Sequence, residues 1–369
     1  MDNLKKTSLH DKHVNLGAKI VPFANHLMPL LYSGVKSEHI NTRNNASVFD
    51  VSHMGLISVK GRDSVKFLNY ITTNNVKKLY NNKIQYSCFI NDKGGIVDDL
   101  LIYMINVNEY LLIVNSSNID KDLLFMKQYN CDHQIEIVDN SNLWSIIALQ
   151  GPKSQDILIK FLNIYDIKVD LSKIKYYHFI TIEHDKIGEV IISTTGYTGS
   201  GGFEIYIKND YSNLVWENLF SIGDLYDLKP AGLAARDTLR LEMGFCLYGN
   251  DINNDTTPIE ANLNFIVDFD KDFLGKNILL KQIENGCHKK LVAFSVLDKG
   301  IPRKGYNILD NNNNIIGAVT SGTMSPSINK GIGLAYINTN FVNENCFIDI
   351  RGKKMMIIFE KLPFYKVQK

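Results

Sequence analysis

The sequence predicts an α+β fold in which mixed helices and strands are followed by a small all-β barrel or sandwich. Apolar residues recur at three- and four-residue intervals in some segments, which indicates helices, while β-branched and aromatic residues gather in others, which indicates strands. From about residue 291 the helical pattern stops, and short strands separated by glycine, proline and asparagine replace it. A length of 369 residues exceeds what one hydrophobic core usually serves, so several packed units are expected.

Strands and helices alternate through the first part of the chain. The expected strands are residues 55–60, 96–105, 110–115, 144–150, 189–193, 203–207 and 266–269. The expected helices are residues 63–72, 118–129, 154–161, 212–223 and 233–244. No fixed-period repeat is visible, which excludes solenoids and propellers.

The last part of the chain is expected to contain strands without helices. These strands are residues 291–296, 307–309, 315–320, 331–337, 346–350 and 355–359. The change of period falls at Glu284-Asn285-Gly286. We therefore expect a domain boundary there, with one region at residues 1–284 and a C-terminal β-barrel domain at residues 285–369.

The composition is that of an ordinary globular protein and excludes several classes of partner. Apolar residues make up 45% and charged residues 21% of the chain, far from the composition of disordered proteins. Lys and Arg number 40 and Asp and Glu 39, so no general field attracts nucleic acid or anionic membranes. No stretch approaches the roughly 18 apolar residues of a membrane span. Five cysteines without a C-x-x-C pair indicate a reducing compartment, and we expect a bacterial cytoplasmic protein.

Several common catalytic motifs are absent from the sequence. Gly275-Lys276 is followed by Asn277, so the chain has no phosphate-binding P-loop. Neither H-E-x-x-H nor G-x-S-x-G occurs. His10 and His13 are close in sequence, but their spacing alone is weak evidence for a metal, and we expect no metal site.

A glycine-rich segment at residues 194–202 lies between two expected strands. It opens no helix, so it is not a dinucleotide-binding fingerprint. Its four glycines permit close approach of the backbone to a ligand, and Tyr197 adds a flat face. A glycine-rich hairpin without a ligand is an equally good interpretation of the segment alone.

Two expected strands carry acids that their own apolar surroundings do not pair. Glu204 stands in the otherwise apolar or aromatic run 203–207, where an unpaired charge is costly. Asp98 and Asp99 open the strand after Gly94-Gly95, and alternation sends the two side chains to opposite faces. A ligand pocket therefore contains at most one of them, and an acid that caps the turn is the alternative.

A third feature is the helix that follows Pro230 and Gly232. Arg236 and Arg240 are four positions apart and share one of its faces. Surface ion pairing is the default interpretation. An arginine near a helix start can equally hold a carboxylate in a planar two-pronged contact.

Taken in order, these segments resemble the T protein of the glycine cleavage system, a tetrahydrofolate-dependent aminomethyltransferase. The matching stretches are residues 16–24, 48–55, 94–100, 114–115, 148–152, 195–199, 232–244, 247–251, 257–261 and 319–326. They extend over nearly the whole chain. The resemblance implies two interleaved α/β folate-binding domains and a C-terminal β-barrel, in agreement with the change of period near residue 285.

The resemblance also implies an activity and its partners. A lipoyl arm on the H protein delivers an aminomethyl group, and the family releases ammonia and passes the one-carbon unit to tetrahydrofolate. The products are 5,10-methylenetetrahydrofolate and dihydrolipoyl H protein. Tetrahydrofolate is then a co-substrate, the P and L proteins belong to the same system, and a monomer is expected.

The family's site residues map onto matching positions of this chain. Asp99 resembles the catalytic carboxylate, and Glu204 resembles the acid that accepts hydrogen bonds from the amino edge of the pterin. Residues that resemble the rest of the folate pocket are Met54, Tyr86, Asn115, Tyr176, Tyr197, Arg236 and Tyr365. Two positions depart from the family pattern: Asn25-His26 replace the usual Gly-Trp, and Ser200 replaces the usual Glu.

Other functions remain as alternatives. Relatives in iron–sulfur maintenance carry a cysteine-containing segment where this chain has Leu-Ala-Ala-Arg-Asp-Thr-Leu-Arg at residues 233–240. Dimethylglycine and sarcosine dehydrogenases place a flavin unit before the domain, and no nucleotide fingerprint precedes it here. A scaffold that binds H protein or folate without catalysis is disfavoured by Asp99, Glu204 and Arg236.

Overall fold

The computed structural model describes residues 4–131, 133–342 and 344–366, and the chain divides into two compact units. The first unit comprises Met1–Val65, Lys78–Gln85 and Leu101–Asp237. The second comprises Lys66–Lys77, Tyr86–Leu100 and Thr238–Lys369. Each unit is built from segments that are discontinuous in sequence.

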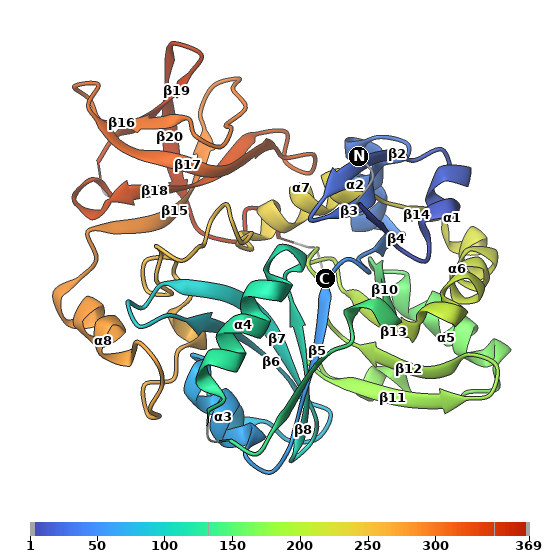
Figure 1. The fold of residues 1–369 in the computed structure, drawn as a ribbon. Coiled ribbons are helices and arrows are strands. Elements are labelled where there is room, and N and C mark those ends of the chain that lie inside the picture. The colour runs from blue at the N-terminus through green and yellow to red at the C-terminus, as the bar shows by residue number, and fades with distance from the viewer. Residues whose placement is uncertain (1–3, 132, 343, 367–369) are drawn as a thin grey trace. The chain divides into compact units, whose positions relative to one another are not determined.

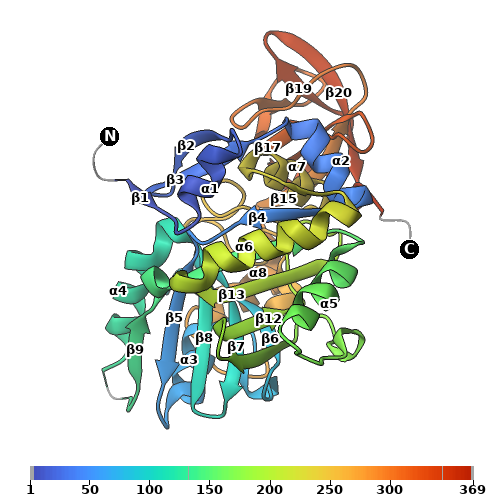
Figure 2. The same cartoon turned by 90° about the vertical axis from the view of Figure 1, so that its right-hand side faces the viewer.

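The first unit contains a six-stranded sheet with its own core. Its strands, in spatial order, are β11 (Phe179–His184), β12 (Gly188–Ser193), β13 (Gly202–Lys208), β10 (Trp144–Gln150), β4 (Ala46–Asp50) and β14 (Leu228–Pro230). Helices α5 (Ser154–Ile164) and α6 (Asn209–Gly223) supply Phe161 and Trp216 to the core cluster that includes alternate residues of β13 (Figure 2). Because side chains alternate along a strand, the intervening residues of β13 point to the opposite face.

A three-stranded sheet completes the N-terminal part of the first unit. It contains β1 (Lys5–Lys6), β3 (His26–Leu31) and β2 (Lys19–Phe23) in that order, with the helices α1 (His10–Asn15) and α2 (Val35–Asn44). Ala24 and Asn25 form the turn between β2 and β3, both with positive φ. Asparagine tolerates this conformation, so the departure at Asn25 is compatible with a tight two-residue hairpin.

A five-stranded sheet is inserted in sequence between β4 and β10. Its order is β6 (Ile84–Ile90), β7 (Ile96–Asn106), β8 (Glu109–Val114), β5 (Gly55–Lys60) and β9 (Glu136–Asp139). Helices α3 (Ser64–Ile71) and α4 (Ile119–Tyr129) belong to the same stretch of chain. The chain thus forms part of one sheet, builds a second and returns to the first, which confirms two interleaved α/β regions.

The C-terminal strands close into a barrel, which confirms the barrel and excludes the sandwich (Figure 1). The strands follow the order β15 (Lys289–Val296), β18 (Gly331–Asn338), β17 (Ile315–Met324), β16 (Asn307–Leu309), β19 (Cys346–Ile350) and β20 (Lys353–Glu360). Strand β15 pairs with both β18 and β20 and so closes the ring. Phe294 and Val296 belong to the barrel core, while Leu291 and Ala293 pack in a separate cluster with Ile96.

One expected strand is wrong, and three helices, α1, α2 and α8, were not expected. Residues 266–269 form no strand, because Ile266 ends a 3₁₀ turn, η6 (Asn264–Ile266), and is buried among side chains instead of pairing in a ladder. Helix α8 (Lys276–Asn285) begins after Gly275, whose φ is +76°. The remaining long helix, α7, spans Leu233–Met243. Within the described residues, no helix is both long and apolar enough to cross a membrane.

Candidate functional site

Glu204 lies on β13 and points away from the core of the first unit. Phe203, Ile205 and Ile207 belong to the core cluster, whereas Glu204 and Tyr206 occupy the other face. The Glu204 side chain is buried, with 8% of its surface exposed. The charge that the sequence places in this apolar strand therefore requires partners from other elements.

Hydroxyl groups from four segments, β7, β12, β13 and the glycine-rich loop, form the network around Glu204. Thr195 donates a hydrogen bond to Oε2 of Glu204. Thr195 lies 2.6 Å from Ser193, and Ser193 accepts from the phenol of Tyr103 at 3.1 Å. The Tyr103 and Tyr206 phenol oxygens are 2.8 Å apart. Glu204 thus ends a buried hydroxyl network.

Arg236 and Tyr197 bring a cation and an aromatic ring into the same unit. The Arg236 guanidinium lies over the Tyr197 ring, 4.7 Å from its centroid. Burial lowers the pKa of Arg236, and the charge of Glu204 opposes that shift. Nη1 of Arg236 is buried and has no hydrogen-bond partner among residues 4–131, 133–342 and 344–366. Such an atom is costly to bury unless a ligand pairs with it.

His53 lies on the segment between β4 and β5 and, like Arg236, has a buried nitrogen, Nδ1, without a hydrogen-bond partner in the described part of the chain. Burial, followed by the positive charge of Arg236, lowers the pKa of His53 to about 3. The imidazole is therefore neutral at physiological pH. Sequence reasoning assigned His53 no role.

Two buried side chains hold the glycine-rich loop. The Gln150 amide donates to the carbonyl oxygens of Thr195 and Phe203, each at 3.2 Å, and its oxygen accepts from Thr198 at 2.7 Å. Arg43 donates to the Thr198 carbonyl oxygen at 2.6 Å and to the Ser200 hydroxyl at 2.7 Å. Ser200, one of the two departures from the family pattern, thus still takes part in holding the loop.

Asp99 lies in the second unit, on β7, with a different set of neighbours. The Tyr86 phenol donates to Oδ2 of Asp99 at 3.0 Å. Burial, and then the charge of Asp99, raise the pKa of the Tyr86 phenol and of the Cys88 thiol well above their ordinary values. Both groups therefore remain protonated. Asp98 is fully buried and Asp99 is not, as alternation along the strand predicts.

The structure places the other predicted site residues as follows. Met54, in the turn before β5, and Asn115, just after β8, are half-buried residues of the first unit. Tyr176, also in the first unit, is exposed over 68% of its surface. Tyr365, in the second unit, is half-buried, and its backbone N–H donates to the Glu242 carbonyl oxygen at 3.4 Å. The structure thus brings together Glu204, Tyr197 and Arg236 in one unit, and Asp99 and Tyr86 in the other.

Two groups singled out by sequence have structural partners. Arg240 is buried in the second unit and forms an ion pair with Asp251 at 2.8 Å, so surface ion pairing is wrong for this residue. His13 contacts Asp50 at 2.8 Å in the core of the first unit. Burial works to raise the pKa of Asp50, but hydrogen bonds from His13, Ser52 and Thr7 and the charge of His13 lower it to about 2.

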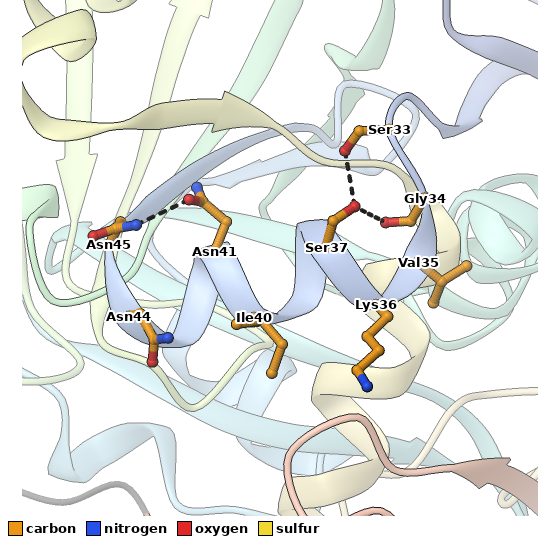
Figure 3. Close-up of a pocket in the computed structure, with 9 residues that line it drawn as sticks. All are labelled: Ser33, Gly34, Val35, Lys36, Ser37, Ile40, Asn41, Asn44 and Asn45. Atoms are coloured by element: carbon orange, nitrogen blue, oxygen red, sulfur yellow. Dashed lines mark hydrogen bonds between the residues drawn. The ribbon is translucent and has the colours of Figure 1, made fainter.

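A surface hollow of about 780 Å³ lies along α2 and does not contain the predicted site residues. Figure 3 shows Ser37 and Asn41 on one side of the helix and Lys36, Ile40 and Asn44 on the other. Just before this helix, Glu38 accepts from the backbone N–H groups of Ser33 and Gly34.

Sequence reasoning missed the residues that hold Glu204 and its loop. They are Arg43, Tyr103, Gln150, Ser193, Thr195 and Tyr206. Alternation along β13 would have identified Tyr206, which shares a face with Glu204. No local signal identifies Tyr103 or Arg43, which lie 103 residues from Tyr206 and 157 residues from Ser200, respectively.

Comparisons with known proteins agree over nearly the whole chain. Residues 9–271 match the GCVT N-terminal domain, and residues 289–366 match the glycine cleavage T-protein C-terminal barrel domain. The aminomethyltransferase of Flavobacterium psychrophilum is 48% identical over 98% of this chain and 100% of the relative, and that of Bacteroides thetaiotaomicron is 46% identical with the same coverage.

A solved structure supports the same assignment. The crystal structure of glycine cleavage system aminomethyltransferase T from Bartonella henselae matches with a TM-score of 0.89 and 32% identity, covering 98% of both chains. Fold, domain matches and relatives therefore agree, and the chain belongs to the glycine cleavage T-protein family.

Proposed function

We propose that this chain is the aminomethyltransferase of a bacterial glycine cleavage system. It takes the aminomethyl group from the lipoyl sulfur of the H protein and transfers the carbon to tetrahydrofolate. The carbon loses its bonds to sulfur and to the amino nitrogen and gains bonds to two folate nitrogens. The two protons that leave those nitrogens go to the thiol of dihydrolipoyl H protein and to ammonia, and the other product is 5,10-methylenetetrahydrofolate.

The observation that carries this proposal is the group formed by Glu204, Arg236 and Tyr197. Glu204 supplies a buried acceptor and Tyr197 a flat ring, and Nη1 of Arg236 is a buried donor without a partner in the described residues. A flat heterocycle with an amino edge and an acidic tail matches these residues: its amino edge donates to Glu204, its ring stacks on Tyr197, and an acceptor atom pairs with Arg236. The residues present therefore fit tetrahydrofolate.

The proposal gives each predicted residue a role. Glu204 accepts from the amino edge of the pterin, and Arg236 contacts the folate. Met54, Tyr86, Asn115, Tyr176 and Tyr197 form walls of the pocket, and Tyr365 lies toward the folate tail.

Asp99 is proposed to act by electrostatics and orientation. Its carboxylate stabilises positive charge that develops on the transferred carbon and orients the attacking amine. It also helps to move the proton from that amine. The buried phenol and thiol beside it stay protonated, so they add no competing negative charge.

The proposal extends to organisation and partners. We propose that the protein works as a cytoplasmic monomer with the P, H and L proteins of the same system. The proposed division is at residues 284 and 285. In the structure α8 ends at Asn285 and β15 begins at Lys289, which is compatible with this division.

The test combines folate binding with the complete reaction. Wild-type protein, mixed with aminomethyl-loaded H protein and tetrahydrofolate, should form methylenetetrahydrofolate. The variant Glu204→Gln keeps the shape of the side chain but replaces one acceptor oxygen by a donor, and its affinity for tetrahydrofolate should fall about tenfold to a hundredfold. The variant Glu183→Gln, on an exposed position of β11, is the matched control.

Two results would contradict the proposal. Folate binding without product in the wild-type protein would favour the scaffold function. Equal affinity in Glu204→Gln and Glu183→Gln would remove Glu204 from pterin recognition.

A further inference from the structure

Four buried hydroxyl groups of the first unit form a chain that ends on Glu204. The Tyr206 and Tyr103 oxygens are 2.8 Å apart, Tyr103 and Ser193 are 3.1 Å apart, and Ser193 and Thr195 are 2.6 Å apart. Thr195 then contacts Oε2 of Glu204. Strands β7, β12 and β13 and the glycine-rich loop each contribute a member, so only the folded unit assembles the chain.

Counting protons assigns a direction to every bond in the chain. Thr195 donates its proton to Oε2 of Glu204. A hydroxyl has a single proton, so Thr195 accepts from Ser193 and Ser193 accepts from Tyr103. Tyr103 has then used its proton and accepts from Tyr206. All four protons are directed toward the carboxylate.

Three longer contacts do not change this direction. Tyr206 lies 3.5 Å from Oε2 of Glu204, Ser193 lies 3.4 Å from the Glu204 carbonyl oxygen, and the Tyr103 oxygen lies 3.4 Å from the Thr195 oxygen. All three exceed the usual length of an O–H···O bond, and if Tyr206 donated to Glu204, the single proton of Tyr103 could serve only one of its two shorter contacts. Burial raises the pKa of both phenols, so each keeps the proton that it donates.

We infer that Tyr206, Tyr103, Ser193 and Thr195 form a one-directional hydroxyl relay that positions Glu204 and makes its site selective for ligands with N–H donors. Hydrogen bonds in such a chain polarise one another, so the terminal bond to the carboxylate is strengthened. The relay occupies one lone pair of Oε2 and prevents rotation of the carboxylate. The remaining lone pairs accept from a ligand, and a ligand that presents a methyl group there leaves them unpaired.

This inference rests on the proposed function, because it makes the relay responsible for recognition of the amino edge of the folate. The relay residues are positioning residues. They should control folate affinity and selectivity while leaving turnover at saturating folate unchanged.

The binding test uses tetrahydrofolate and an analogue that has a methyl group in place of the 2-amino group. In Thr195→Val, which removes the hydroxyl but keeps the shape, the affinity ratio between the two compounds should fall about tenfold, the value of one hydrogen bond to a charged group. Thr195→Ser restores the hydroxyl and should restore the ratio. Tyr103→Phe should lower it by a smaller factor, while Tyr110→Phe, a buried tyrosine on β8 outside the relay, should leave it unchanged.

A second measurement tests the relay without any ligand. In protein labelled at the tyrosine Cζ atoms, Thr195→Val should shift the NMR signal of Tyr206, to which Thr195 has no direct hydrogen bond among the described contacts. An unchanged Tyr206 signal in Thr195→Val would overturn the relay. So would a selectivity ratio in Thr195→Val equal to that of Tyr110→Phe. Failure of the wild-type protein to bind tetrahydrofolate would instead contradict the proposed function, and the NMR result would still decide on the relay.

Discussion

The two acids on which the proposed chemistry depends have contrasting surroundings. Glu204, in the first unit, ends a chain of hydroxyl groups, and Thr195 donates directly to it. Asp99, in the second unit, accepts from the Tyr86 phenol at 3.0 Å and has the Cys88 thiol close enough for its charge to raise the thiol pKa. Hydroxyl groups are strong donors, and thiols are weak ones.

The difference indicates how one fold assigns two tasks to two carboxylates. A carboxylate that is held by directed hydrogen bonds has fixed lone pairs, which suits recognition of a ligand edge. A carboxylate whose neighbouring phenol and thiol stay protonated exerts its field without a competing negative charge, which suits stabilisation of a transition state. We therefore expect substitutions near Glu204 to change binding and substitutions at Asp99 to change turnover.

The largest expected effect comes from Asp99→Asn. This change removes the charge with little change of shape, and turnover should fall by a factor of about 10² to 10⁴ if general acid-base assistance is the main contribution. Tetrahydrofolate affinity should stay within about threefold of the wild-type value. Asp92→Asn, at an exposed turn before β7, is the control for the assay of methylenetetrahydrofolate formation. Near-normal turnover of Asp99→Asn would contradict the assignment of turnover to Asp99 and of binding to Glu204.

The second effect concerns two glycines, one near each acid. A Cβ atom at Gly95 would overlap the backbone carbonyl oxygen of Asn254, which is part of the main chain. A Cβ atom at Gly196 would overlap only the tip of the Gln150 side chain. We expect Gly95→Ala to lower the free energy of unfolding by about 3 kcal/mol and Gly196→Ala by about 1 kcal/mol.

Urea unfolding followed by circular dichroism measures both glycine variants. Folate affinity gives the complementary result, because Gly196→Ala disturbs the loop that presents Tyr197. The Gln150 amide bonds to Thr195, Thr198 and Phe203. If Gly95→Ala and Gly196→Ala lost the same stability, this amide would be as rigid as a main-chain carbonyl.

The third prediction concerns Arg236, the cation near Glu204. Arg236→Gln removes a charge-assisted donor, and tetrahydrofolate affinity should fall about tenfold to thirtyfold while turnover at saturating folate is retained. Isothermal titration calorimetry measures the affinity, and the exposed Arg62→Gln is the matched control. Loss of turnover at saturating folate without loss of affinity would assign Arg236 to the reaction and would contradict the division of tasks.

The smallest effect is expected at Ser200. The variant Ser200→Ala removes the hydroxyl that accepts from Arg43 at 2.7 Å, but the Thr198 carbonyl still accepts from Arg43. The Michaelis constant for folate should rise about threefold to fivefold, the cost of a single hydrogen bond, with kcat unchanged. Steady-state kinetics, with the exposed Ser37→Ala as control, test this expectation. An unchanged Michaelis constant would show that the bond from Arg43 to Ser200 is not needed to hold the loop.

Much of the fold could be predicted from sequence because its signals are local. Residues 55–60, 144–150, 307–309 and 346–350 form strands with the expected bounds. The expected strand at residues 266–269 failed because a short apolar run fits a buried turn as well as a ladder. Arg240 was misjudged for a related reason: its partner Asp251 lies beyond the helix, where spacing along the helix gives no information.

The sequence by itself determined the α+β class, the helices α3 to α7, the helix-free C-terminal strands and the resemblance to the family, because hydrophobic period, turn residues and ordered motifs are properties of neighbouring residues. Only the tertiary structure decided which side chains surround each acid. Tyr103 meets Ser193 across 90 residues and Tyr206 across 103 residues, through strand pairing and packing that no local pattern encodes. A hydrogen bond between side chains requires both atoms within about 3 Å, and that distance exists only after the strands have paired.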